Sequence, residues 1–236
     1  GSRMFAEVPK KQLVKTFVSE SFLKEKANRE LLGKLPYETV TDAVFAAMAD
    51  TQTPQGILAK VRQMEWTLAE ILERGKKQQG ARLLLLETIQ DPGNLGTILR
   101  TAEGAGITGV IMNEETVDIY SPKVTRSTMG AIYRLPFVYV KDWKESLLEL
   151  KRQGIRLYAA HLAAKHSYDE EDYRKNGFGF LIGNEGNGLT EETAALADCY
   201  IKIPMEGEVE SLNAAVAASI LMFEAARQRR HITKSL

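Results

Sequence analysis

Residues 181–189 read Leu-Ile-Gly-Asn-Glu-Gly-Asn-Gly-Leu, and residues 203–213 read Ile-Pro-Met-Glu-Gly-Glu-Val-Glu-Ser-Leu-Asn. Each stretch begins with a short apolar run that predicts the end of a strand, and each leads into a predicted helix. The glycines of the first stretch carry no Cβ, so a ligand can approach the backbone closely. Loops at the carboxyl ends of strands are the usual ligand sites of α/β sheets. We therefore expect a binding site within residues 181–213.

Strands and helices alternate from residue 81 onward. Strands are predicted at 83–86, 110–112, 136–140, 155–160, 178–182 and 200–203, and helices at 95–105, from 122, at 143–153 and at 212–226. The 83–86 run is apolar throughout, as is typical of a parallel strand buried on both faces. This alternation predicts an α/β fold with a parallel sheet and helices on both faces. The 212–226 helix is apolar nearly all round, so we expect it to pack against both the sheet and a partner chain.

The first part of the chain has a different organisation. Strands are predicted at 12–18 and 57–61, and helices at 21–32, ended by Gly33, and at 41–49. A short helical stretch at 66–72 and a polar segment at 74–80 follow. We therefore predict a small α/β domain over 1–62, a linker over 63–80 and a larger domain over 81–236.

Composition limits the classes of function. Lys and Arg number 31 and Asp and Glu also number 31, so no global charge indicates nucleic acid, and an RNA partner would need a local basic patch. The single Cys199 allows no intrachain disulfide and is typical of a cytoplasmic protein. His161, His166 and His231 have no ligand-like spacing, so we expect no metal. No apolar run approaches the length of a membrane span, so we expect no membrane association.

Polar residues follow the first strand of the larger domain. Asn94 stands at a predicted helix start, where its side chain can cap the helix or meet a ligand, and Arg100 lies six residues further on. The plain alternative is a strand–turn–helix with a capping asparagine and a solvated arginine. Neither a Walker phosphate loop nor the spaced glycines of a dinucleotide site follow this strand.

Three more polar residues lie in the two glycine-containing stretches. Glu185 either holds an arginine or is a solvated turn residue. Ser211 is well suited to cap the last helix. Asn213 lies in an otherwise apolar helix start, where a buried amide needs hydrogen-bond partners.

In this order and spacing the motifs resemble the SpoU (TrmH) family of RNA 2′-O-ribose methyltransferases, of the SPOUT class, over residues 81–227. The matching residues are Asn94, Gly96 and Arg100, then Gly183, Asn184, Glu185, Gly186 and Gly188, then Ile203, Pro204, Met205, Gly207, Ser211, Leu212 and Asn213. Residues 12–62 resemble the later part of the small substrate-binding domain that many members carry, so we expect that domain to be truncated.

The resemblance implies a C-terminal trefoil knot whose loops, here 183–188 and 203–213, bind S-adenosylmethionine. It also implies a homodimer that buries the last helix and builds each active site from two chains. The residues expected to bind the cofactor are Leu181, Gly183, Asn184, Gly188, Ile203, Met205, Ser211 and Leu212.

The implied reaction is methylation of a ribose 2′-hydroxyl in RNA, with Arg100, Asn94, Glu185, Ser211 and Asn213 as the expected catalytic residues. The family assigns activation of the hydroxyl to the arginine matching Arg100. A guanidinium is a poor base because its pKa exceeds about 12, so a role as a cation that stabilises the alkoxide and a phosphate is the alternative. Glu185 would then orient Arg100, and Ser211 and Asn213 would hold ribose and phosphate oxygens.

Ribosomal RNA is the favoured substrate, and transfer RNA is the alternative. A non-catalytic RNA-binding module of the same fold would be expected to lack polar motif residues, and here all five are present. A nucleotide-binding enzyme on a Rossmann-like sheet would bind a dinucleotide and have no affinity for S-adenosylmethionine.

Overall fold

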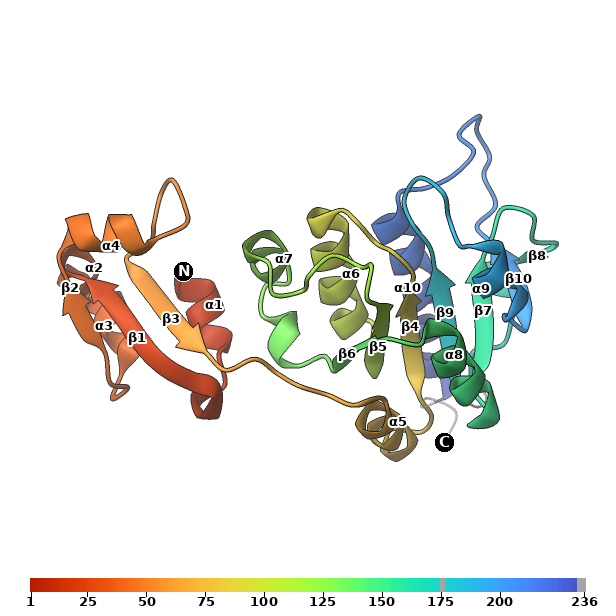
Figure 1. The fold of residues 1–236 in the computed structure, drawn as a ribbon, viewed down its shortest axis with the longest axis horizontal. Helices are drawn as coiled ribbons and strands as arrows, with labels where there is room; N and C mark the ends of the chain where they lie inside the picture. Colours follow the sequence, from red (N-terminus) through yellow and green to blue (C-terminus); the bar gives the residue numbers. More distant parts are fainter. Residues whose placement is uncertain (175–176, 233–236) are drawn as a thin grey trace. The chain divides into compact units, whose positions relative to one another are not determined.

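The computed structural model describes residues 1–174 and 177–232. The chain forms two compact units, Gly1–Met64 and Glu65–Leu236 (Figure 1). Each unit has its own sheet, three-stranded in the first and seven-stranded in the second.

The larger unit is built on a parallel sheet with the strand order β6-β5-β4-β9-β7-β10-β8. Its strands are β4 (Arg82–Leu86), β5 (Gly109–Asn113), β6 (Phe137–Val140), β7 (Arg156–Ala160), β8 (His166–Ser167), β9 (Phe178–Ile182) and β10 (Cys199–Lys202). Every residue of β5 and β9 is buried, as expected for strands covered on both faces. The predicted parallel α/β sheet is confirmed.

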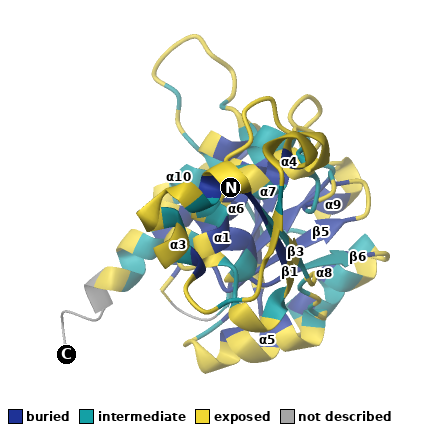
Figure 2. Cartoon of the chain, turned by 90° about the vertical axis from the view of Figure 1, so that its left-hand side faces the viewer, coloured by how far each residue is buried: buried dark blue, intermediate teal, exposed yellow. Residues whose placement is uncertain are grey.

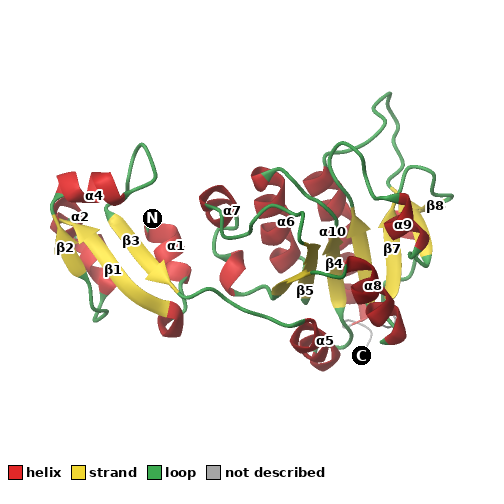
Figure 3. Ribbon diagram, in the orientation of Figure 1, coloured by secondary structure: helices red, strands yellow, loops and turns green. Residues whose placement is uncertain are grey.

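Helices cover the sheet of the larger unit. They are α5 (Leu68–Lys77), α6 (Pro92–Gly104), α7 (Pro122–Ser127), α8 (Trp143–Arg152), α9 (Glu191–Ala195) and α10 (Ala214–Ile232). Helices α5 and α8 share one apolar cluster with the sheet, through Ile71, Leu72, Leu147 and Leu150. Helix α10 contacts α6 and β9, and Figure 3 shows it behind the strands where α8 lies in front.

The smaller unit has the strand order β2-β1-β3, with β1 (Leu13–Ser19) parallel to β2 (Glu38–Val40) and antiparallel to β3 (Ile57–Val61). Its helices are α1 (Ser2–Glu7), α2 (Glu20–Lys24), α3 (Lys26–Leu32) and α4 (Asp42–Met48). The core consists of Phe5, Val18, Phe22, Leu32 and Ile57.

The helix predicted over 21–32 is in fact two helices. Glu25 has an extended backbone (φ −79°, ψ 129°) between α2 and α3. Carbonyls released by this break are bonded by side chains, Phe22 O by Asn28 Nδ2 at 3.0 Å and Lys24 O by Arg29 Nη1 at 2.8 Å. The predicted end at Gly33 is confirmed, because this residue has φ +55°.

The segment predicted as a linker over 63–80 contains helix α5. A capping box starts this helix, with Glu70 N donating to Thr67 Oγ1 at 3.2 Å and Thr67 N donating to Glu70 Oε2 at 2.8 Å. Ile71 and Leu72 are buried in the core of the larger unit. The linker prediction is therefore wrong for residues 68–77, whose polar side chains lie on the exposed face of an amphipathic helix.

Helix α10 starts two residues later than predicted and runs further, to Ile232. Its buried side chains are Ala215, Ala218, Leu221, Met222 and Ala225. Val216 and Phe223 are 46% and 45% exposed, so part of the apolar surface of the helix faces outward. The burial colours of Figure 2 show that α10 has exposed residues along its length. Among the residues that the structure describes, no helix combines the length and apolar character needed to cross a bilayer.

Candidate functional site

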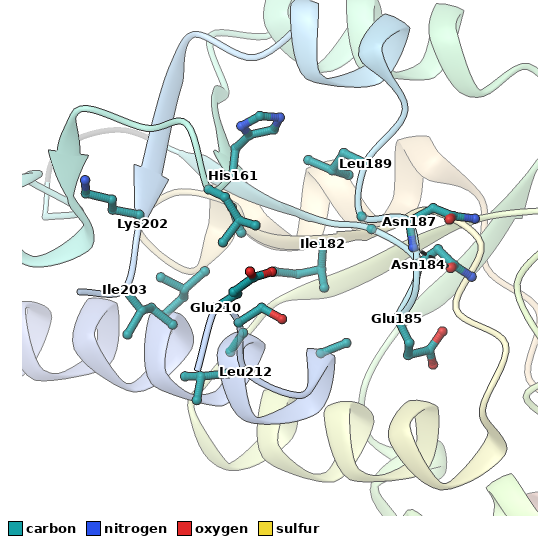
Figure 4. Close-up of a pocket in the computed structure, with 18 of the residues that line it drawn as sticks. His161, Ile182, Asn184, Glu185, Asn187, Leu189, Lys202, Ile203, Glu210 and Leu212 are labelled. Atoms are coloured by element: carbon teal, nitrogen blue, oxygen red, sulfur yellow. Dashed lines mark hydrogen bonds between the residues drawn. The ribbon is translucent and has the colours of Figure 1, made fainter. Parts of the chain in front are cut away.

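A cavity of about 310 Å³ opens at the carboxyl ends of β7, β9 and β10 (Figure 4). This volume is within the usual range for small-molecule sites. The last residues of the three strands, Ala160, Ile182 and Lys202, line it, together with the loops at 183–189 and 203–212. Its apolar walls include Ile182, Leu189, Ile201, Ile203, Leu212 and Leu221.

Seven of the eight residues predicted to bind the cofactor line this cavity, namely Gly183, Asn184, Gly188, Ile203, Met205, Ser211 and Leu212. Leu181 does not. Its side chain is fully buried in the core cluster beneath the α5 and α8 face. Successive side chains of a strand point to opposite faces, so the neighbouring Ile182 is the β9 residue that reaches the cavity.

The 183–188 loop is closed by its own hydrogen bonds. Asn184 and Gly188 exchange two backbone bonds of 2.9 Å. Asn184 Oδ1 accepts from Gly186 N at 2.9 Å and Asn187 N at 3.1 Å, and its Nδ2 donates to Thr88 O at 2.9 Å. Both ends of the Asn184 amide therefore hold the loop.

Gly183 is required by the loop itself. A Cβ on Gly183 would lie 2.1 Å from Gly188 C and 2.2 Å from Leu189 N, and backbone atoms cannot move aside. Gly188 has φ +70° with open space around it, so its requirement is conformational. The loop thus needs glycine at 183 because the backbone of residues 188 and 189 packs against it, and glycine at 188 because the backbone there is left-handed.

A buried carboxylate fixes the far end of the same loop. Glu87, 5% exposed at the exit of β4, accepts from Thr190 N and Thr190 Oγ1 at 2.9 Å each, and also from Thr193 Oγ1. Thr193 Oγ1 in turn accepts from Trp143 Nε1 at 3.0 Å. Both arms of the loop are therefore tied to the end of β4, one through Thr88 and the other through Glu87.

One polar residue from each of the three motifs, Asn94, Glu185 and Asn213, takes part in one network. Glu185 accepts from Asn94 Nδ2 at 3.0 Å and from the backbone nitrogens of Asp91 at 3.1 Å and Gln90 at 3.2 Å. Asn94 Oδ1 accepts from Asn213 Nδ2 at 2.9 Å. Residues far apart in the sequence are thus joined beside the cavity.

The two helix caps differ from those predicted. Asp91 caps α6, with its Oδ1 accepting from Asn94 N at 2.8 Å, so the Asn94 side chain is free for Glu185. Asn213 caps α10, with its Oδ1 accepting from Ala215 N at 2.9 Å and Val216 N at 3.3 Å. The alternative in which Ser211 only caps this helix is therefore wrong, and the cap by Asn213 explains why an asparagine precedes this apolar helix.

The environment lowers the pKa of Glu185. Partial burial acts in the opposite direction, but it is outweighed by hydrogen bonds from the Asn94 amide and from the backbone N–H groups of Asp91 and Gln90. Each of these bonds favours the charged carboxylate. Glu185 is therefore an anion that orients the Asn94 amide at neutral pH.

Arg100 and Ser211 stand apart from this network. Six helical residues turn the chain by about 600°, so Arg100 projects about 120° away from Asn94 around α6. Its side chain is exposed, and in the described part of the chain no hydrogen bond or ion pair joins it to Glu185. Ser211 lines the cavity without a hydrogen bond among these residues. Of the five predicted catalytic residues, the hydrogen-bond network within this single polypeptide therefore contains Asn94, Glu185 and Asn213.

Three residues with ionisable side chains that line the cavity were not expected from the sequence: His161, Lys202 and Glu210. His161 stacks on Tyr200 with ring centroids 4.9 Å apart, and its Nδ1 accepts from Ala163 N at 3.1 Å. His161 follows β7 directly and Lys202 ends β10. Their position at the carboxyl end of a strand could have indicated from the sequence that they line the site. Over the described residues no group of His, Cys, Asp and Glu is arranged to hold a metal.

Comparisons with families of known proteins match both units of the chain. The SpoU rRNA Methylase family model matches residues 81–223, and the RNA 2′-O ribose methyltransferase substrate binding model matches residues 6–67. The 23S rRNA (guanosine(2553)-2′-O)-methyltransferase RlmP of Bacillus subtilis is 34% identical over 78% of this chain and 70% of its own length. The 23S rRNA (guanosine-2′-O-)-methyltransferase RlmB of Xanthomonas campestris is 37% identical over 74% and 71%.

Solved structures agree with these matches. The SpoU methyltransferase AviRb from Streptomyces viridochromogenes, in complex with the cofactor AdoMet, has a TM-score of 0.84 and 28% identity over 98% of this chain and 89% of that chain. An AdoMet-bound rRNA methyltransferase from Sinorhizobium meliloti has a TM-score of 0.76 and 31% identity over 94% and 81%.

Proposed function

This chain belongs to the SpoU rRNA methylase family, and we propose that it methylates a ribose 2′-hydroxyl of ribosomal RNA with S-adenosylmethionine as the methyl donor. The observation that carries the proposal is the junction of the cavity with the Asn94–Glu185–Asn213 network. AdoMet-bound relatives support the cofactor, and the two 23S rRNA relatives support the RNA. An RNA substrate and a single free Cys199 support a cytoplasmic location.

The residues present fit S-adenosylmethionine. The cavity has a volume in the range of small-molecule sites, apolar walls that suit the adenosine, and polar lining groups. We assign Gly183, Asn184, Gly188, Ile203, Met205, Ser211 and Leu212 to cofactor binding. When bound, the cofactor supplies a methyl group on a sulfonium, so the chain has to place the nucleophile and stabilise the charge that develops on it.

Asn94 and Asn213 have hydrogen-bonding capacity left for the RNA. Asn94 uses one N–H on Glu185 and one lone pair on Asn213, and Asn213 uses one N–H on Asn94. Each amide nitrogen therefore keeps a second N–H, and Asn94 Oδ1 keeps a second lone pair. These groups can hold the ribose hydroxyl, and Glu185 acts as a positioning residue because it fixes which end of the Asn94 amide faces the site.

We assign to Arg100 the role of a cation that binds the flanking phosphate and the developing alkoxide. A guanidinium presents its donors in a fixed planar fork that matches phosphate oxygens. Its side chain is exposed and carries no carboxylate partner within the described chain, so it is available for an RNA phosphate. Ser211 is assigned to a ribose or phosphate oxygen.

A homodimer fits the surface of α10. Val216 and Phe223 are exposed apolar side chains on a helix whose opposite face is in the core. Leu221 of the same helix is only 1% exposed and lines the cavity, so a substitution there would not probe a dimer interface. Phe223→Asp should instead give a monomer in sedimentation, and an unaltered protein that is monomeric at micromolar concentration would contradict the dimer.

We also propose that the segment from β9 to α10 forms the trefoil knot.

The smaller unit is assigned to the first contact with RNA. Residues 1–64 contain ten Lys and Arg against seven Asp and Glu, whereas residues 65–236 contain 21 against 24. The substrate-binding family model matches residues 6–67. Local positive charge predicts that RNA affinity falls as the salt concentration rises.

The proposal is tested by mapping 2′-O-methyl nucleotides by mass spectrometry in RNA from cells with and without the protein. One methylated position in ribosomal RNA that depends on the protein is the expected result. The same dependence in transfer RNA would favour the alternative substrate. Binding of S-adenosylmethionine without a methylated position in any RNA would favour the non-catalytic module.

A further inference from the structure

Four ionisable side chains line the cavity, and only one of them both points inward and is unpartnered. Glu185 is bonded to Asn94, and His161 is stacked on Tyr200. Lys202 extends to the edge of the group of side chains drawn in Figure 4. Glu210 directs its carboxylate toward the middle of that group (Figure 4). Within the described residues no hydrogen bond or ion pair holds the Glu210 carboxylate.

Glu210 lies in the loop that leads directly into the polar network. Glu210 precedes Ser211 and stands three residues before Asn213, whose amide is bonded to Asn94. If the polar network holds the ribose hydroxyl, the donor methyl and its sulfur must lie against the same network. The sulfur would then share the cavity with the Glu210 carboxylate, which is one of its lining groups.

We propose that Glu210 is a specificity residue that favours the methylated, sulfonium form of the cofactor over the demethylated product. This inference rests on the proposed function, because it assumes that S-adenosylmethionine binds in this cavity. The two forms share every group except the methyl and the positive charge on sulfur. An attraction between a carboxylate and that charge therefore acts on the substrate and is lost once the methyl has left.

The expected size of this effect is modest. Apolar walls reduce screening around the Glu210 carboxylate, but the residue itself is exposed to water. Because positive charge on sulfur declines in the transition state, the attraction strengthens binding of the donor and does not speed the chemical step. Its consequence for turnover is weaker competition by the neutral product, because the donor is bound more tightly and the product is not.

Two other contacts would give a different pattern of affinities. The α-ammonium and the ribose hydroxyls of the cofactor are present in both forms. If Glu210 bound either of these groups, its removal would weaken both forms to the same degree.

The test is calorimetry of S-adenosylmethionine and S-adenosylhomocysteine with the full chain and with Glu210→Gln. We expect the Kd for S-adenosylmethionine to rise about 3- to 10-fold and the Kd for S-adenosylhomocysteine to change less than about twofold. Glu208→Gln is the matched control, because Glu208 is an exposed carboxylate of the same loop that does not line the cavity. It should leave both affinities unchanged.

Equal weakening of the two ligands by Glu210→Gln, or no change in either, would overturn the inference and leave the proposed function intact. Absence of S-adenosylmethionine binding by the unaltered protein would overturn both.

Discussion

The two loops that line the cavity are built in opposite ways. The 183–189 loop is closed by backbone bonds, by both ends of the Asn184 amide and by the buried Glu87 carboxylate at its exit. The loop from 204 to 212 makes no hydrogen bond with any described residue, and six consecutive residues, 206–211, are exposed. It is held at its ends, by β10 and by the Asn213 cap.

This difference indicates how the site works. A wall that is formed in advance lowers the ordering cost of binding. A segment with few buried contacts and few hydrogen bonds belongs to the low-stability end of a structure, so it can admit a ligand and then order on it. We infer that the 183–189 loop recognises the cofactor and that the 204–212 loop closes on it.

The largest effect is expected from a pair of glycine substitutions, one in each loop. Gly183→Ala places a Cβ 2.1 Å from Gly188 C, so the loop cannot close, and we expect cofactor affinity to fall more than about 100-fold. Gly207→Ala meets nothing within 4 Å, so we expect a change of less than about twofold. Calorimetry with S-adenosylmethionine measures both, and circular dichroism shows whether each variant folds.

Equal losses in the two glycine variants would show that the 204–212 loop is as constrained as the 183–189 loop. Full binding by Gly183→Ala would place the ligand elsewhere.

Arg100 belongs to neither loop, so its removal separates methyl transfer from cofactor binding. Arg100→Ala should reduce the rate of transfer to a cognate RNA roughly 10²-fold or more and leave cofactor affinity nearly unchanged. Arg100→Lys keeps the charge but loses the planar fork, so it should remain badly impaired. Single-turnover methylation measures the rate. Near-normal turnover by Arg100→Ala would make Arg100 a solvated helix residue.

The buried Glu87 carboxylate and its hydrogen bonds to Thr190 and Thr193 form a clamp on the 183–189 loop. Weakening this clamp should have an intermediate effect. Glu87→Gln replaces one acceptor oxygen with an NH₂ group and removes the charge, so its three hydrogen bonds to Thr190 and Thr193 are lost, reversed or weakened in a buried site. We expect a loss of about 1–3 kcal/mol in the free energy of unfolding, measured by urea denaturation. The loosened loop should also bind S-adenosylmethionine about tenfold more weakly.

Glu192→Gln is the control for this clamp. It removes an exposed ion pair with Lys144 from the same helix α9, and such pairs contribute little to stability. A Glu87→Gln variant as stable as this control would contradict the clamp.

The smallest expected effect is a pH dependence from Glu185. Its pKa is lowered in the folded chain, so its stabilising contribution is present above the unfolded value of about 4.3 and is lost as pH falls through the folded value. Glu185→Gln does not titrate. Its urea midpoint should therefore fall less between pH 6 and pH 3.5 than that of the unaltered protein. Equal falls would show that the three hydrogen bonds do not discriminate the charged form.

Most strands of both units were predictable from the sequence because burial on one or both faces leaves a direct pattern. The short strands β2 (Glu38–Val40) and β8 (His166–Ser167), in which no residue is fully buried, were not predicted. The 57–61 strand has the predicted bounds, and the 178–182 strand matches β9. Helix ends were less predictable. The break at Glu25 depends on side-chain bonds from Asn28 and Arg29, and α5 extends through a polar segment because its opposite face is buried.

Asn94, Glu185, Ser211 and Asn213 were found because each occupies a glycine-rich or helix-start position, but the partners of these residues were not found. The Asn94–Asn213 bond joins residues 119 positions apart, and no local pattern encodes it. The same holds for Glu87, which reads as the end of an apolar strand although its carboxylate holds Thr190. Glu210 was missed because its inward direction arises from the path of the whole 203–213 loop.

The most direct test of the account is hydrogen exchange of backbone amides with and without saturating S-adenosylmethionine. We predict strong new protection within residues 204–212, and little change in the 183–189 amides that are already hydrogen-bonded. Protection that appears only outside these two loops, or no change in the 204–212 amides on binding, would contradict the claim that this pair of loops forms the cofactor site.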